Sequence, residues 1–281
     1  MTTEALEPGA YRDFVRRALA EDLGWGDATV QAVVAPEARA EGVLLARSAG
    51  VVAGLEVALE VFRQLDPAVV VTVQRRDGDP FQAGDRIANV AGLAAPMLTA
   101  ERTALNFLRH LSGIATLTRK YMDACGGRVP VADTRQTLPM LRLLQKYAVR
   151  VGGGINGRFA LDEGIIIKTN HLRVAGGITA AIKHAHKAAP DTPIEVEING
   201  PAEAGEALDA GAGVILYAGA SLDDLRAIVD RCRNRARVEV SGPIAVDRID
   251  ALAATGADFV SIAALTDSAP AADITFELRS V

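Results

Sequence analysis

The sequence predicts an α/β protein in two parts, an N-terminal α+β module followed by a parallel sheet of repeated βα units. From Pro130 onward, short apolar strands alternate with amphipathic helices, which is the pattern of parallel sheets with buried strands. Before about residue 115, helices and short strands follow one another in mixed order and turn motifs separate them. The length of 281 residues fits either two domains or one α/β barrel with an appendage.

The N-terminal part contains helices with an apolar periodicity of three to four residues and strands rich in valine. The first helix stops at the glycines around Trp25, and Asp77-Gly78-Asp79-Pro80 is typical turn chemistry. The expected helices span residues 11–22, 55–65 and 99–118, and the expected strands span 43–46, 51–53 and 69–73.

The C-terminal part contains six βα units, which can close into a full or a partial barrel. The expected strands span residues 130–133, 164–168, 193–197, 213–217, 237–240 and 258–262. The expected helices between them span residues 140–151, 178–189, 202–210, 222–233 and 246–255.

Charge, cysteine content and hydropathy exclude several classes of function. The formal net charge is −5, which argues against a general affinity for nucleic acid or for anionic membranes. The two cysteines, Cys125 and Cys232, lie far apart and outside any metal-binding motif, so a reducing compartment fits. No apolar run approaches the ~20 residues that span a bilayer. A cytoplasmic protein is therefore expected.

Polar side chains collect where the predicted parallel strands end, which is where α/β barrels carry their chemistry. Arg135, Arg158 and Lys168 would crowd one mouth of the barrel. Desolvating such cations is costly, so either carboxylates such as Glu197 and Asp133 neutralise them or an anionic ligand does. A pocket for a small polyacid is one interpretation, and surface salt bridging is the other.

Several motifs carry a resemblance to a known family. They are VADTRQTLPMLRLLQKYAVRVGGGINGRFALDEGIIIKTNHL, AEDLGWGDATV, AERTALNFLRHLSGIATLT, IEVEI and SIAALTDSAPAADITFEL. Together and in this order they resemble the quinolinate phosphoribosyltransferase family, the carboxylating nicotinate-nucleotide pyrophosphorylases. The resemblance covers nearly the whole chain.

The resemblance implies an N-terminal α/β open sandwich at residues 1–115, completed by about residues 268–281, and an incomplete, six-stranded parallel α/β barrel at residues 116–267. It also implies an enzyme, a glycosyltransferase of the phosphoribosyltransferase type. The family reaction joins quinolinate to phosphoribosyl pyrophosphate (PRPP) with Mg²⁺ and yields nicotinate mononucleotide, CO2 and pyrophosphate. Homodimers in which each subunit completes its partner's active site are expected.

Residues carried over from the family imply a carboxylate-binding pocket with a ligand of the metal and the ribose beside it. Arg102 matches an arginine donated across the dimer interface, and Glu197 matches a ligand of the metal and the ribose. Lys168 and Glu197 are the expected catalytic residues. The expected substrate-binding residues are Arg102, Arg135, Arg158, Lys168, His171, Ser241 and Gly242. For His171, a helix-capping role is at least as strong an interpretation.

The chain departs from the family pattern at the same strand ends. Ala218-Gly219 stands in place of an Asp-Asn pair, and Pro243 removes a backbone N–H that faces phosphate in the family. Asp267 places a negative charge near the phosphate, so weakened binding of PRPP is expected. The remaining departures are Gln136 for lysine, Gly157 for histidine, Thr169 for aspartate and Ala263 for glycine.

Three functions follow from this pattern. The first is the family reaction on a pyridine or related ring carboxylic acid. The second is a repurposed enzyme that keeps the carboxylate pocket without PRPP and Mg²⁺, such as a decarboxylase or another group-transfer enzyme. The third is a non-catalytic paralogue, against which the retained cations count.

Overall fold

The computed structural model describes residues 5–280 and divides the chain into two compact units. The first unit comprises the described residues of Met1–Arg119, Pro139–Gly153 and Ala269–Val281. The second comprises Lys120–Leu138 and Gly154–Ser268. Residues 139–153, which the alternating pattern assigns to the barrel, therefore group with the first unit.

A four-stranded antiparallel sheet forms the centre of the first unit, in the order β12-β1-β5-β3. Its strands are β1 (Arg39–Ala46), β3 (Val70–Val73), β5 (Arg86–Leu93) and β12 (Ile274–Ser280). The C-terminal strand thus completes the N-terminal sheet. β5 was not predicted, because its Ala, Asn and Gly residues have weak strand propensity; pairing with β1 on one side and β3 on the other compensates.

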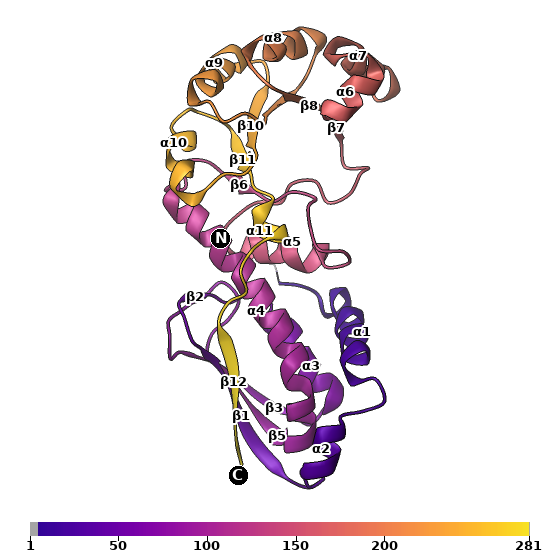
Figure 1. Cartoon of the computed structure of the whole chain (residues 1–281), viewed down its shortest axis with the longest axis vertical. Helices are drawn as coiled ribbons and strands as arrows, with labels where there is room; N and C mark the ends of the chain where they lie inside the picture. Colours follow the sequence, from indigo (N-terminus) through magenta and orange to yellow (C-terminus); the bar gives the residue numbers. More distant parts are fainter. Residues whose placement is uncertain (1–4, 281) are drawn as a thin grey trace. The chain divides into compact units, whose positions relative to one another are not determined.

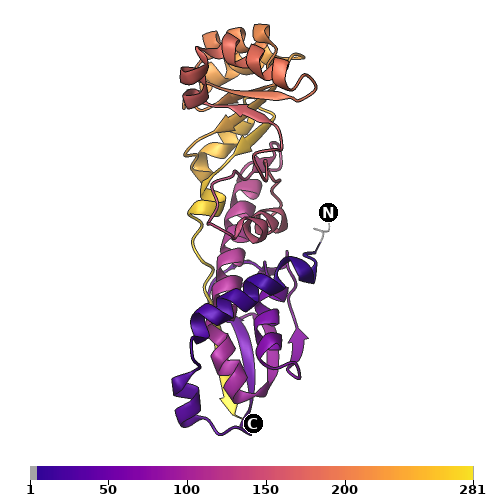
Figure 2. The same cartoon turned by 90° about the vertical axis from the view of Figure 1, so that its right-hand side faces the viewer.

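The helices of the first unit are α1 (Arg12–Leu23), α2 (Ala28–Val33), α3 (Leu55–Leu65), α5 (Arg142–Val151) and the first 26 residues of α4 (Ala94–Ala124). Figures 1 and 2 show α3 and the first part of α4 alongside the sheet and α5 beyond one of its ends. Phe62 of α3 packs against Phe276 of β12 with ring centroids 5.4 Å apart. α4 extends beyond the expected 99–118 at both ends, since Pro96 lies in its first turn, where proline is tolerated. A 3-10 turn (η1, Pro8–Ala10) and a small β2–β4 pair (Gly50–Val51 with Pro80–Phe81) complete the unit.

Six parallel strands form the sheet of the second unit, in the order β6-β11-β10-β9-β8-β7. They are β6 (Val131–Ala132), β7 (Ile165–Ile167), β8 (Ile194–Ile198), β9 (Val214–Tyr217), β10 (Arg237–Ser241) and β11 (Phe259–Ser261). The sheet has two edges, β6 and β7, so the barrel is incomplete. All six predicted strands are confirmed within one or two residues.

Helices follow the strands of this sheet and arch around its outer face (Figure 1). They are α6 (Thr169–Ala175), α7 (Ile178–Ala188), α8 (Pro201–Ala210), α9 (Leu222–Cys232), α10 (Ile249–Ala253) after the 3-10 turn η2 (Val246–Arg248), and α11 (Ala264–Asp267). The short helices α2, α6 and α11 were not predicted, because four to seven residues carry too little periodicity. None of the helices in residues 5–280 is long and apolar enough to cross a membrane.

Candidate active site

We define the barrel mouth as the carboxyl ends of the six parallel strands together with the loops that follow them. Asp133, directly after β6, organises one side of the mouth. Its buried carboxylate accepts hydrogen bonds from Asn156 Nδ2 (2.5 Å) and from the backbone N–H of Gly157 (2.9 Å). These bonds fix the position of Arg158, the next residue in the chain.

The Arg158 guanidinium donates a hydrogen bond to the protein, but one of its donors has no protein acceptor. Its Nη1 donates to the Gly164 carbonyl (3.1 Å), whereas its Nε is buried and donates to no described residue. Burial raises the pKa of Glu195 on β8, and the positive charge of Arg158 acts against that rise. A buried guanidinium donor without a protein acceptor suits an anionic ligand.

Gly157 is tightly enclosed. A Cβ atom at this position would lie 2.6 Å from the Asp133 carbonyl oxygen, which is a backbone atom that cannot move aside cheaply. The histidine that the family carries at this position therefore does not fit the present backbone.

A second corner of the mouth joins β7 to β8. Thr169 donates two hydrogen bonds to Glu197 Oε1, from Oγ1 (2.5 Å) and from its backbone N–H (3.3 Å). His171 Nδ1 accepts from the Lys168 N–H (2.9 Å), the capping role weighed for it in the sequence. Lys168 itself is exposed and makes no ion pair within residues 5–280, so an ion pair with Glu197 or Asp162 does not explain it.

Beneath this corner lies a buried acid network that the sequence reasoning missed. The carboxyl groups of Glu195 on β8 and Glu239 on β10 interact with each other electrostatically, and the Ser261 hydroxyl on β11 donates a short hydrogen bond to Glu239. Burial, followed by the neighbouring Glu239 carboxylate, raises the pKa of Glu195 to about 8. Burial also raises the pKa of Glu239, against which the positive charges of Lys168 and Arg237 act.

A signal for this network was present in the sequence. In IEVEI and RVEVS, strand alternation places every second residue on one face. Glu195 therefore points to the same side as Glu197, and Glu239 to the same side as Ser241. Only Glu197 and Ser241 were singled out, because the resemblance named them.

The loops after β9 and β10 do not offer the row of free backbone N–H groups that a phosphate-binding loop provides. Gly219 lies over the Tyr217 ring, where a Cβ would approach the phenolic oxygen to 2.2 Å, and the Ser221 N–H donates to that oxygen (3.3 Å). After Ser241, which ends β10, Gly242 has a φ of 145° that other residues rarely adopt. The next residue, Pro243, is exposed and offers no N–H.

The described residues do not form a protein site for Mg²⁺. Within residues 5–280, no group of three or more His, Cys, Asp and Glu side chains could hold a metal ion. One oxygen of Glu197 already accepts two hydrogen bonds, and position 218 carries no carboxylate. Glu197 as a metal ligand thus remains a prediction, and no chemical step is derived through a metal here.

Arg102 belongs to the first unit, on the exposed surface of α4. Two threonines that flank it in the helix are bonded to the last turn of α1 and to the residue that caps α2. Thr99 Oγ1 donates to Asp27 (3.1 Å) and Thr103 Oγ1 donates to Asp22 (3.0 Å).

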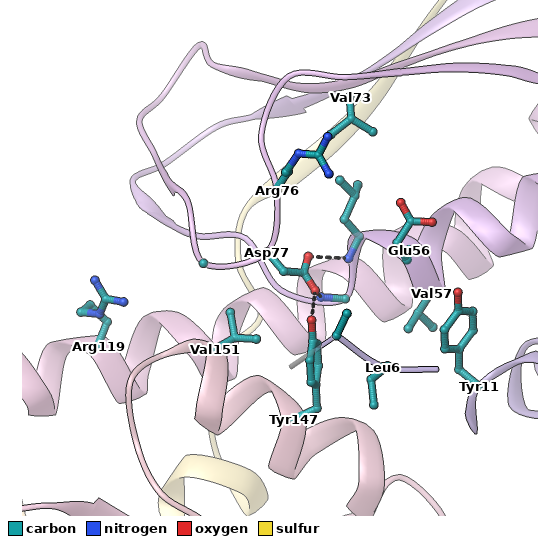
Figure 3. Close-up of a pocket in the computed structure, with 14 residues that line it drawn as sticks. Leu6, Tyr11, Glu56, Val57, Val73, Arg76, Asp77, Arg119, Tyr147 and Val151 are labelled. Atoms are coloured by element: carbon teal, nitrogen blue, oxygen red, sulfur yellow. Dashed lines mark hydrogen bonds between the residues drawn. The ribbon is translucent and has the colours of Figure 1, made fainter. Parts of the chain in front are cut away.

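The first unit also contains a cavity of about 440 Å³ near the start of α3 (Figure 3). Asp77 accepts hydrogen bonds there from the N–H groups of Gly54 (2.8 Å) and Leu55 (3.0 Å) and from the Tyr147 hydroxyl (2.8 Å). These are the bonds of a helix cap, supplied from a distant turn. Burial raises the pKa of both Asp77 and Tyr147. We assign this cluster to the stability of the first unit.

An antiparallel sheet unit and an incomplete α/β barrel with cations at its mouth define an α/β protein of the barrel class. Comparison with known proteins identifies the family. A model of the quinolinate phosphoribosyl transferase C-terminal domain matches residues 114–277, and one of the N-terminal domain matches residues 27–112. The chain belongs to the quinolinate phosphoribosyl transferase family, and the fold that the resemblance implied is confirmed.

Individual relatives support this family assignment. The chain is 40% identical over 278 residues to the nicotinate-nucleotide pyrophosphorylase [carboxylating] of Mycobacterium leprae, covering 96% of this chain and 97% of that protein. It is 39% identical over 260 residues to the probable enzyme of the same name from Bacillus subtilis, covering 92% and 90%. The crystal structure of NadC from Streptococcus pyogenes is similar with a TM-score of 0.93, 39% identity and 99% coverage of both chains.

Proposed function

We propose that this protein catalyses the carboxylating nicotinate-nucleotide pyrophosphorylase reaction, or the same reaction on a closely related ring carboxylic acid. The ring nitrogen of quinolinate would attack C1 of PRPP, forming the N–C bond while pyrophosphate leaves. The C2 carboxylate would then leave as CO2, and a proton would take its place. The relatives described above, which are named for this activity, give no support to a repurposed or non-catalytic member.

The observation that carries the proposal is the partly unsatisfied guanidinium of Arg158 at the barrel mouth, on the same side as Lys168. Both positive charges act against the rise in the pKa of Glu195 that burial causes. Two cations at the mouth suit the two carboxylates of quinolinate, since charge-assisted hydrogen bonds are among the strongest available.

The chain's own residues would bind and orient the acid. Arg158 would hold one carboxylate from a loop fixed by Asp133, and Arg135 would add a second guanidinium from the end of β6. Lys168 would sit over the acid network and stabilise negative charge that develops on the ring. Positioning of this kind accounts for a large share of catalysis when two reactants must meet.

We further propose a homodimer in which Arg102 enters the partner's pocket, as the family resemblance implies. Ser241 and Gly242 would face the phosphates of PRPP. Since position 218 carries no carboxylate and Pro243 no N–H, we expect a high KM for PRPP.

Isothermal titration of quinolinate into the Arg158→Ala variant tests the acid pocket. We expect the Kd for quinolinate to rise more than tenfold, because one charge-assisted contact is worth ~1.5–3 kcal/mol. Arg226→Ala is the matched control: Arg226 is an exposed residue of α9 paired with Asp223, and its loss should leave the Kd unchanged. Equal affinity in the Arg158→Ala variant and the wild type would refute the pocket.

A further inference from the structure

The cavity of the first unit (Figure 3) is large enough for a small organic molecule. All the residues that line its volume of about 440 Å³ belong to the first unit, and small-molecule sites span roughly 300–1,000 Å³. A Cβ atom at Gly78, which lines the cavity, would meet nothing within 4 Å, so the space beside this backbone is open. Most of the walls are apolar or aromatic, formed by Leu6, Leu55, Val57, Val73, Tyr147 and Val151.

The two acids that line the cavity already have partners. Asp77 accepts the three hydrogen bonds described above, two of them from the start of α3. Glu56 pairs with Arg63 at 2.9 Å, and Arg63 does not line the cavity. Neither carboxylate therefore needs a cationic ligand.

The two arginines that line the cavity have no acidic partner. Arg119 donates from Nε to the Gly152 carbonyl (3.0 Å), so its two Nη groups are available for a ligand. Neither Arg119 nor Arg76 forms an ion pair in the part of the chain that the structure describes, residues 5–280. The unbalanced charge at this cavity is thus positive, which favours an anionic ligand.

Tyr11 marks the end of the cavity opposite to Arg119. Figure 3 shows the two residues at opposite ends of the lining, with Tyr147 between them. Tyr11 is only 3% exposed, yet no hydrogen bond among the described residues involves its hydroxyl. A buried tyrosine hydroxyl usually has a partner. Burial raises the pKa of Tyr11, and the carboxylates of Glu56 and Glu60 raise it further, so the hydroxyl keeps its proton and can donate.

We propose that this cavity binds an elongated aromatic carboxylic acid with a polar group at its far end. The carboxylate binds to the Arg119 guanidinium, with the charge of Arg76 adding attraction, and the polar group accepts a hydrogen bond from Tyr11. The aromatic body lies against Tyr147 and the apolar walls, where its burial is favourable. All these residues belong to the first unit, so the proposal does not depend on the reaction at the barrel mouth.

Isothermal titration with 6-hydroxynaphthalene-2-carboxylate tests the site, since this probe carries a carboxylate and a hydroxyl on opposite ends of a rigid aromatic body. We expect saturable binding to the wild type and the same Kd in Arg158→Ala, which impairs the barrel mouth. The corresponding carboxamide keeps the shape without the charge and should bind about tenfold more weakly. Absence of binding, equal affinity for acid and amide, or weaker binding of the acid to Arg158→Ala would overturn the proposal.

Two variants test the two ends of the ligand. Arg119→Gln should raise the Kd for the acid about tenfold and leave that for the amide unchanged. Tyr11→Phe should raise the Kd for the hydroxylated probe about fivefold but not that for naphthalene-2-carboxylate, which lacks the hydroxyl. The control is Arg47→Gln, at an exposed arginine paired with Glu277, which should change neither. Affinities that depend on neither Arg119 nor Tyr11 would refute the proposal.

Hydrogen–deuterium exchange of the wild-type protein locates the probe without any variant. The probe should slow exchange of the amides in residues 73–78 and 147–151, two segments that line the cavity. Exchange in residues 156–171, at the barrel mouth, should not change. Protection confined to residues 156–171 would place the probe at the barrel mouth and contradict a site in the first unit.

Discussion

Thr169 shows how one residue changes the barrel mouth. Where the family has an aspartate, the Thr169 hydroxyl donates to Glu197, so a potential repulsion between carboxylates becomes a bond between the start of α6 and β8. The same corner carries Lys168. Thr169, which in the sequence is only a departure from the family pattern, thus connects two elements of the site.

Thr169→Val tests this link. The substitution keeps the shape and removes the hydroxyl, so the Glu197 carboxylate loses one charge-assisted hydrogen bond. We expect kcat/KM to fall about tenfold, a cost of ~1.4 kcal/mol. Thr169→Ser retains the donor and should behave as wild type in the same assay. Equal kinetics of the valine and serine variants would show that the bond does not contribute.

Glu195 makes the stability of the second unit dependent on pH. Its folded-state pKa of about 8 lies above the ordinary 4.5, so the unfolded chain releases this proton first as pH rises. Stability is therefore lost progressively from about pH 4.5 to about pH 8.

Glu195→Gln removes the cost of ionising a buried carboxyl. The variant should gain roughly 2 kcal/mol relative to wild type between pH 5 and pH 8, and little below pH 5. Urea unfolding at several pH values measures the difference, with the exposed Glu203→Gln of α8 as control. A stability difference that does not change with pH would rule out the raised pKa.

Among the elements, the six strands of the second unit could be predicted almost residue by residue. Their apolar runs are short and are bounded by helices of clear periodicity, which is the pattern of repeated βα units. β5 and the short helices could not be predicted, because their formation depends on neighbouring strands or on a capping side chain such as Asp27.

The loop between Ile155 and β7 is an element whose packing the sequence does not reveal. Ile155 forms a parallel β-bridge with Ala132, the last residue of β6. The loop then leads to β7 at the other edge of the sheet. Gly157 is where this loop touches Asp133. The position of Arg158 thus depends on Gly157, and the sequence shows only that this glycine replaces the histidine of the family.

Gly157→Ala should displace this loop. Its new Cβ would meet the Asp133 carbonyl oxygen at 2.6 Å, so the backbone must shift and carry Arg158 with it. We expect the Kd for quinolinate to rise about tenfold while the fold is retained, since a small displacement of a binding group is costly. Gly213→Ala is the control, because its Cβ would meet nothing closer than 3.9 Å. Unchanged affinity in the Gly157→Ala variant would mean that the loop yields freely.

At the scale of the whole molecule, the described residues fold into two compact units. The cations of the barrel mouth could be predicted from strand ends, and the family from motifs spread over the chain. The acid network of Glu195, Glu239 and Ser261 could not, because three strands separated in sequence bring it together.

Ala218 and Pro243 both replace residues that the family uses to bind PRPP, so a double variant tests them together. Ala218→Asp combined with Pro243→Gly restores a carboxylate and a backbone N–H at the mouth. We expect the KM for PRPP to fall about tenfold or more, since each factor of ten is only ~1.4 kcal/mol. Steady-state kinetics at saturating quinolinate measure it. A double variant with an unchanged KM would mean that the phosphate side has diverged further than these two positions.

The central claim is that the protein joins a ring carboxylic acid to phosphoribose and releases CO2. The most direct test mixes the wild-type protein with carboxyl-labelled quinolinate, PRPP and Mg²⁺, and follows labelled CO2 and pyrophosphate together. We predict that both are released in equal amounts and only when both substrates are present. Binding of quinolinate without release of either product, or release of CO2 without PRPP, would contradict the claim.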